Sequence, residues 1–238
     1  MLFIPKEIQF IIDTLVKNGF EAYLVGGCVR DMLMDIPPHD YDITTSAPPE
    51  TIISLFKKTV PTGIKHGTVT VINGGIAAEV TTYRADGEYA DHRRPETVTF
   101  VKSLKEDLAR RDFTVNAIAY NEKEGIRDFF GGIEDINKKI LRAVGDPEKR
   151  FCEDALRILR LFRFASVLGF APEKGTLKAA LKCAPLLESI SAERISSELR
   201  KAVSGKNPMS LKPLTDIGGL QFIGIKNPDY LKIIPLQS

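Results

Sequence analysis

The chain has 238 residues, 43% of them hydrophobic, which is enough for one sizeable core and a smaller second unit. Its formal net charge of +2 does not by itself select a partner. Cys28, Cys152 and Cys183 show neither a disulfide framework nor the spacing of a zinc site, and they suit a reducing cytoplasm. The amino terminus lacks a signal-peptide layout, and no segment reaches membrane length. We therefore expect a soluble cytoplasmic protein without a membrane partner, whose oligomeric state is unknown.

The first predicted element is an amphipathic helix over Lys6–Lys17. Pro5 precedes it, Gly19 follows it, and apolar residues recur inside it at helical spacing, namely Ile8, Ile11, Ile12 and Leu15. This pattern predicts a helix that packs one face on the core.

A strand, a glycine turn and a helix are predicted next. Glu21 to Val25 reads as a short apolar strand, and Cys28 to Met34 as a helix. Gly26 and Gly27 between them are free to adopt positive φ. Such a turn presents backbone N–H groups to an anion, and Arg30 could add a bidentate phosphate contact.

Two carboxylates follow in the stretch Asp40-Tyr41-Asp42-Ile43. In an extended strand residues i and i+2 face the same side, so Asp40 and Asp42 should project together. Like charges this close repel unless a cation lies between them, and Mg²⁺ prefers oxygen ligands. The pattern favours a metal-nucleotide site. A solvated polar strand end is the alternative interpretation.

A second helix is predicted over 49–58, followed by a β-hairpin. Residues 68–72 alternate with period two, Asn73-Gly74 is a hairpin turn signal, and Ile76 to Tyr83 forms the returning strand. Glu79 on this strand is a candidate third carboxylate, with an ordinary strand glutamate as the alternative.

Five sequence motifs follow one another over roughly the first 200 residues. They are LVGGCVRDMLMDIPPHDYDITTSAPPE, RRDFTVNAIAYN, DFFGGIEDI, EDALRILRLFRFASVLGF and ERISSEL. In these motifs and their order the chain resembles the class II tRNA nucleotidyltransferases, the CCA-adding enzymes, a superfamily shared with bacterial poly(A) polymerases. Five motifs in the family's order are far more specific than any one motif.

The resemblance implies an α+β fold with a polymerase-β-like nucleotidyltransferase head, built from a mixed sheet and flanking helices. We expect the head over residues 1–140, an all-helical neck over 141–205, and the start of a helical body over 206–238. The helical pattern from Asp146 onward agrees with this division. Family members continue into a longer body and tail that hold tRNA, so a truncated product and a natural short form both stay open.

The second motif is associated in the family with the sugar and phosphates of the incoming nucleotide. Arg111 can reach phosphate, Asp112 can accept from ribose hydroxyls, and Asn116 can donate or accept. A structural alternative is that Asp112 caps a helix running through Ala117.

Two further glycine-containing segments are predicted to be a loop and a hinge. Residues 84–95 lack apolar periodicity and predict a mobile loop, which the family links to the switch from adding C to adding A. Because enzymes that add only CC tend to have it shortened, its presence argues against such an enzyme. Residues 128–135 resemble the family's hinge between head and neck, and a plain strand-to-helix turn explains the same glycines.

The stretch from Glu153 to Arg157 is expected to select the base. Asp154 and Arg157 lie three apart, and on one helix they would be neighbours. A carboxylate and a guanidinium could accept C and A and reject G and U. An intrahelical salt bridge is the alternative. Arg160 and Arg163 extend a basic cluster that would attract phosphate-rich ligands.

These expectations combine into one hypothesis: template-independent addition of CCA to the 3′ end of tRNA from CTP and ATP, with Mg²⁺ and release of pyrophosphate. Asp40 and Asp42 would hold the two metal ions of a two-metal nucleotidyl transfer, and Glu79 would join them as a catalytic carboxylate. An A-adding enzyme or poly(A) polymerase on the same head remains an alternative. A nucleotide- or RNA-binding fragment with little turnover is a second alternative.

Overall fold

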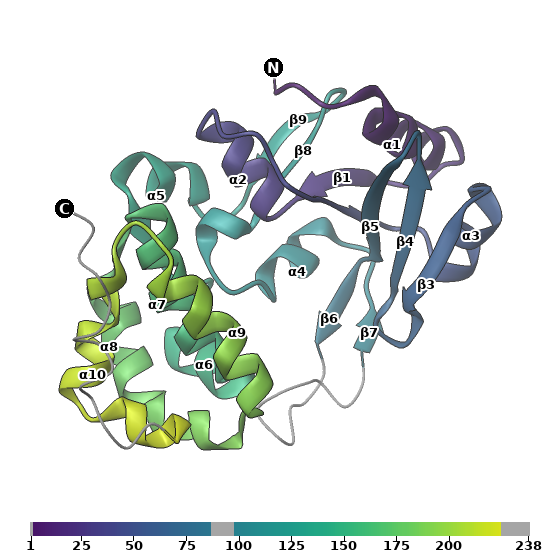
Figure 1. The fold of residues 1–238 in the computed structure, drawn as a ribbon. Coiled ribbons are helices and arrows are strands. Elements are labelled where there is room, and N and C mark those ends of the chain that lie inside the picture. The colour runs from purple at the N-terminus through teal and green to yellow at the C-terminus, as the bar shows by residue number, and fades with distance from the viewer. Residues whose placement is uncertain (1, 87–97, 225–238) are drawn as a thin grey trace. The chain divides into compact units, whose positions relative to one another are not determined.

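A seven-stranded mixed sheet organises the first half of the chain in the computed structural model, which describes residues 2–86 and 98–224 (Figure 1). By their internal contacts, the described residues up to 137 form one unit and those from 138 form another. The first unit carries the sheet, and the second is almost wholly helical. The expected α+β class is confirmed.

The strand order of the sheet is β3-β4-β5-β2-β1-β8-β9. Its strands are β1 (Ala22–Val25), β2 (Tyr41–Thr45), β3 (Thr59–Gly63), β4 (Thr68–Asn73), β5 (Ile76–Thr82), β8 (Ile118–Asn121) and β9 (Gly125–Asp128). Neighbouring strands run antiparallel except β2 and β5, which are parallel. This parallel pair joins two strands that lie far apart in the sequence.

The register separates an apolar face of the sheet from a polar one. Leu24, Ile43, Val80 and Val69 pair across four strands and are all buried. Helices α1 (Lys6–Lys17) and α3 (Pro49–Leu55) contact these strands, and α1 contributes its predicted apolar stripe to the core. Because side chains alternate along a strand, the residues between these face the opposite side. That side carries polar groups.

The early elements follow the sequence patterns closely. The predicted first helix is confirmed over Lys6–Lys17, α2 covers Gly27–Leu33, and β4 and β5 form the predicted hairpin. The second helix ends at Leu55 rather than at residue 58, so that part of the prediction is wrong. Phe56 adopts an extended backbone and is buried, which leads the chain into β3 instead of another helical turn.

Helix α4 (Leu104–Ala109), the 3-10 turn η2 (Thr114–Asn116) and helix α5 (Gly132–Lys138) complete the first unit. The strands β6 (Arg84–Asp86) and β7 (Val98–Phe100) pair antiparallel in a separate sheet. The predicted loop therefore begins with a strand, which corrects its first three residues. Residues 87–97 lie outside the described residues.

Gly132 shows why glycine is needed at the entry to α5. A Cβ atom there would lie 2.2 Å from the carbonyl oxygen of Thr114 and 2.7 Å from Cγ1 of Ile118. We expect Gly132→Ala to lower the free energy of unfolding by about 2 kcal/mol, because backbone and core must shift. Gly131→Ala is the control, since it adds only left-handed strain in open space, about 1 kcal/mol. The measurement is denaturant unfolding, and a larger loss in the free energy of unfolding for Gly131→Ala than for Gly132→Ala would contradict this reason.

The second unit contains α6 (Pro147–Glu153), α7 (Leu156–Leu168), α8 (Lys174–Cys183), α9 (Ala192–Val203) and α10 (Lys212–Asp216). Short parallel strands β10 (Ile140–Leu141) and β11 (Ala171–Pro172) pair beside them. The 3-10 helices η3 (Ala184–Ser189), η4 (Pro208–Leu211) and η5 (Gly219–Ile223) connect or follow the longer helices.

Pro185 lies in the first turn of η3, because proline fits the first helical positions. The predicted start of a body is described only to residue 224, and there it is helical. Within the described part of the chain, none of the helices is long and apolar enough to span a membrane.

Candidate functional site

Three carboxylates gather on the polar face of the sheet, here called the carboxylate cluster: Asp40, Asp42 and Glu79. Asp42 of β2 is the direct partner of Glu79 on β5, and paired residues point to the same face. Strand β2 begins at Tyr41, so Asp40 lies just before the strand instead of within it as expected. The charges of Asp40 and Glu79 both act on Asp42, so these two carboxylates lie within electrostatic range of Asp42.

Burial raises the pKa of the Asp42 carboxyl to about 6, Arg111 opposes this, and the charges of Asp40 and Glu79 add to it. A divalent cation would relieve that repulsion, and the all-oxygen donor set is the kind that Mg²⁺ prefers. Among the described residues, however, no group of three or more His, Cys, Asp or Glu side chains converges closely enough to hold a metal ion. The donors fit Mg²⁺ by chemistry, and their side chains would have to close around it.

The raised pKa of Asp42 predicts a pH-dependent stability. Between about pH 4 and pH 6 the folded protein binds a proton that the unfolded chain does not, so stability increases as pH falls through 6. Above pH 6 the ionised carboxylate destabilises the fold by up to about 3 kcal/mol. We expect metal-free Asp42→Asn to be more stable than wild type at pH 8 and to lose that advantage near pH 4. The measurement is the free energy of unfolding of both proteins, from denaturant titrations between pH 4 and pH 8. A difference between them that stays constant with pH would contradict the prediction.

Gly26 brings the backbone against the same groups. It has φ +80° and ψ −135°, a conformation that glycine adopts at no steric cost. A Cβ atom there would lie 3.0 Å from Nη1 of Arg111 and 3.6 Å from Oδ2 of Asp42. The predicted glycine turn therefore lies next to Asp42 of the carboxylate cluster. Helix α2 begins at Gly27, the residue after this turn position.

Arg30 is engaged inside the protein. Its Nη1 donates to Oδ1 of Asn116 at 2.6 Å, and its Nε and Nη2 donate to Oδ1 of Asp31. Nδ2 of Asn116 donates in turn to Oδ1 of Asp112 at 3.1 Å. Arg30, which lies within α2, thus joins the second motif to this helix, a contact that the sequence pattern did not indicate.

Asp112 is buried and does not cap an α-helix. Its Oδ1 also accepts from the backbone N–H of Phe113, and the following helix is only the 3-10 turn Thr114–Asn116. The predicted helix through Ala117 is therefore wrong. The short turn forms because Ala117 leads directly into β8, where the chain must be extended.

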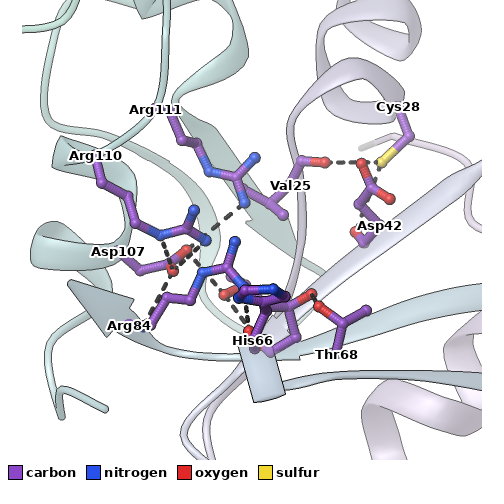
Figure 2. Close-up of polar contacts among 11 residues, drawn as sticks. Val25, Cys28, Asp42, His66, Thr68, Arg84, Asp107, Arg110 and Arg111 are labelled. Carbon is purple, nitrogen blue, oxygen red and sulfur yellow. Dashed lines mark hydrogen bonds and ion pairs between the residues drawn. The ribbon is translucent and has the colours of Figure 1, made fainter. Parts of the chain in front are cut away.

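Arg111 lies between the carboxylate cluster and a carboxylate that sequence reasoning missed, Asp107 on α4. Nη2 of Arg111 is 3.6 Å from Oδ2 of Asp107. Figure 2 shows the two side chains facing each other. Nε of Arg111 is buried and has no hydrogen-bond partner among the described residues. The available signal for Asp107 was its spacing of three and four residues before Arg110 and Arg111, which places oppositely charged groups side by side on a helix.

The second unit corrects the prediction for the base-selecting pair. Helix α6 ends at Glu153, Asp154 has an extended backbone, and α7 begins at Leu156. Asp154 and Arg157 therefore do not share one helical face. Oδ1 of Asp154 accepts from the N–H of Leu156, because the side chain satisfies a donor at the start of the new helix.

These two residues have different ionic partners. Arg157 is buried, and its Nη1 lies 3.1 Å from Oε2 of Glu153. Oδ2 of Asp154 lies 3.3 Å from Nη2 of Arg194 on α9. Each predicted base-reading group is thus held by a neighbouring charge.

Arg160 and Arg163 flank the ring of Phe164 on α7. Their guanidinium carbons lie 5.3 Å and 4.0 Å from its centroid, which is within cation–π range. Nε of Arg163 also lies 2.8 Å from Oε2 of Glu198 on α9. Arg163 therefore helps to fasten α7 to α9.

Comparison with known proteins matches both units. The family model "Poly A polymerase head domain" matches residues 22–142, and "Probable RNA and SrmB- binding site of polymerase A" matches residues 169–223. The CCA-adding enzyme of Geobacillus stearothermophilus is 52% identical over 215 residues, which is 90% of this chain and 53% of that protein. That of Oceanobacillus iheyensis is 52% identical over 197 residues, which is 83% of this chain and 49% of that protein.

Solved structures agree. A crystal structure of Bacillus stearothermophilus CCA-adding enzyme in complex with CTP matches with a TM-score of 0.88 and 45% identity, over 97% of this chain and 57% of that one. Thermotoga maritima CCA-adding enzyme complexed with tRNA-CCA matches with a TM-score of 0.78 and 26% identity, over 95% and 55%. The chain spans about half the length of the curated relatives it matches. With the head model covering more than half of its residues, the chain belongs to the tRNA nucleotidyltransferase/poly(A) polymerase family.

Proposed function

We propose that this chain adds C, C and A to the 3′ end of tRNA from CTP and ATP, without a nucleic-acid template. The observation that carries the proposal is the Asp42–Glu79 pair on adjoining strands, next to Gly26 and Arg111. The names of the relatives support the same activity, and the titles of two solved neighbours name CTP and tRNA-CCA.

We assign nucleotidyl transfer to the head, residues 1–140. The 3′-oxygen of the RNA attacks the α-phosphorus of the nucleotide, the bond to pyrophosphate breaks, and the hydroxyl proton is lost. Asp40 and Asp42 would hold Mg²⁺, with Glu79 beside them. With two ions bound, one would lower the pKa of the attacking hydroxyl and the other would stabilise charge on the leaving pyrophosphate.

The other head residues would position the nucleotide. The backbone at Gly26 and Gly27 allows phosphates to approach closely. Nε of Arg111, which has no hydrogen-bond partner in the part of the chain that the structure describes, can donate to a phosphate oxygen. Asp112 and Asn116 would face the sugar. Arg30 holds Asn116, so it acts on the nucleotide through that contact.

We assign choice of the base to the neck, residues 141–205. C and A present an exocyclic amine donor, whereas G and U carry a carbonyl oxygen at the equivalent position. The carboxylate of Asp154 can accept from that amine, and the guanidinium of Arg157 can donate to the adjacent ring nitrogen. Arg160 and Arg163 would add positive charge nearby.

The deciding experiment uses tRNAs that end before C74, C75 or A76, each supplied with CTP, ATP or both. Completion to CCA and no further is expected. Long A tails would identify a poly(A) polymerase, and addition of A alone would identify an A-adding enzyme. Binding without extension would reduce the chain to a nucleotide- or RNA-binding fragment.

A further inference from the structure

Asp107 is a charged side chain sealed inside the first unit. It sits on the short helix α4 with no solvent exposure. Burying an ionised carboxylate is strongly unfavourable unless partners compensate it. Although burial alone would raise the pKa of Asp107, the charges of Arg110 and Arg111 hold it below its usual value. The carboxylate is therefore a fixed negative charge.

The two oxygens of Asp107 have different partners. Oδ1 accepts from Nε and Nη2 of Arg110 at 3.0 and 2.9 Å, and from the backbone N–H of Arg84 at 3.3 Å. Oδ2 accepts from Oγ1 of Thr44 at 3.0 Å and faces Nη2 of Arg111 at 3.6 Å. Figure 2 shows the three arginines around this one carboxylate. Oδ1 anchors the side chain, which leaves Oδ2 to act on Arg111.

The anchoring places Asp107 on the same face of β2 as the carboxylate cluster. Thr44 is two residues from Asp42 on that strand, so both side chains point to one face. Arg111 lies between Asp107 and Asp42, since its Nη1 and Oδ2 of Asp42 both border the site of a Cβ on Gly26. The guanidinium is therefore attracted from both sides.

We propose that Asp107 is a positioning residue that holds Arg111 away from Asp42. Without this charge, the guanidinium would form an ion pair with Asp42 and compete with the divalent cation for its oxygens. With it, Asp42 stays open to the cation, and Arg111 keeps a donor for phosphate. The effect of Asp107 on catalysis rests on the proposed function. Its effect on Mg²⁺ affinity rests only on the positions of Asp107, Arg111 and Asp42.

The test is Asp107→Asn, which keeps the shape and removes the charge. We expect Mg²⁺ to bind this variant about tenfold more weakly, measured by calorimetry without nucleotide, and the Mg²⁺ needed for half-maximal CTP incorporation to rise equally. Adding Arg111→Gln to Asp107→Asn should restore Mg²⁺ affinity, because the competing guanidinium is gone. A merely structural role of Asp107 would not be rescued in this way.

Glu21→Gln is the matched control, because it also removes a carboxylate charge from the first unit and leaves Arg111 untouched. Its hydrogen bond from the Tyr83 hydroxyl can be kept by the amide oxygen, so wild-type Mg²⁺ affinity is expected. Should Asp107→Asn not fold, Asp107→Ser removes the same charge with a smaller side chain, and at least about threefold weaker Mg²⁺ binding is expected.

Three results would each overturn the inference: wild-type Mg²⁺ affinity in folded Asp107→Asn, failure of the double variant to restore the affinity, or wild-type affinity in folded Asp107→Ser. If wild-type protein extends no tRNA while the calorimetric difference holds, the proposed function fails and the positioning role stands. If wild-type protein extends tRNA and the calorimetric difference is absent, the proposed function stands and the positioning role fails.

Discussion

Replacing Asp42 by alanine is expected to abolish nucleotide incorporation while the protein stays folded. Asp42 is the one carboxylate of the cluster that adjoins Gly26 and pairs in register with Glu79. If Asp42 holds the metal as proposed, its loss removes a ligand at the point where charge develops, which corresponds to a loss of roughly a thousandfold or more. Asp40→Ala should have a similar effect. The measurement is incorporation of labelled CMP into tRNA lacking CCA, with circular dichroism as the test of folding.

Glu50→Gln is the control for this experiment. Glu50 is an exposed carboxylate in the first turn of α3, on an element that covers the core rather than the cluster. It should retain wild-type incorporation. Wild-type rates in a purified Asp40→Ala, Asp42→Ala double variant would refute the catalytic assignment, whatever the other variants show.

The carboxylate cluster could be predicted from sequence because local rules determine most of it. Period-two alternation places Asp42 on one face of its strand, and the Asn73-Gly74 signal defines the hairpin that carries Glu79. The direct pairing of Asp42 with Glu79, however, could not be predicted from local rules. It depends on β2 running parallel to β5, a non-local contact that neither strand's pattern specifies.

Partners of buried charges were less predictable, because tertiary packing selects them. Arg30 was expected to face a phosphate, but it bonds to Asn116, which lies 86 residues away in the chain. Asp107 reads in sequence as one acidic residue of an ordinary helix. Only the packing of α4 against β2 shows that Thr44 and three arginines enclose it.

The break at Asp154 shows a limit of helical spacing. Residues 147–168 read as helix almost continuously, and three-residue spacing then predicts that Asp154 and Arg157 are neighbours. An aspartate side chain can bond nearby backbone N–H groups, and here it starts a new helix by accepting from Leu156. The spacing rule fails because its premise, one uninterrupted helix, fails.

The second large effect expected is on nucleotide choice, through Asp154 and Arg157. Asp154→Ala removes the proposed acceptor for the exocyclic amine of C and A, and Arg157→Ala removes the proposed donor to the ring nitrogen. The preference for CTP and ATP over UTP and GTP should fall by about tenfold to a hundredfold, since wrong bases are rejected by leaving buried polar groups unpaired. The measurement is kcat/KM for all four nucleotides on the same tRNA. Unchanged preference in both variants would exclude the base-reading role.

The helix break makes a matched control necessary, because Asp154→Ala also removes the bond to the N–H of Leu156. Asp146 caps α6 in the same unit by accepting from Lys149, so Asp146→Ala should lose a similar stability, about 1 kcal/mol, without changing nucleotide preference. Asp154→Asn separates the two roles further. Its amide can keep the bond to Leu156, and it offers both a donor and an acceptor to the base. It should therefore retain stability and incorporate UMP and GMP more readily, because discrimination depends on a group that only accepts.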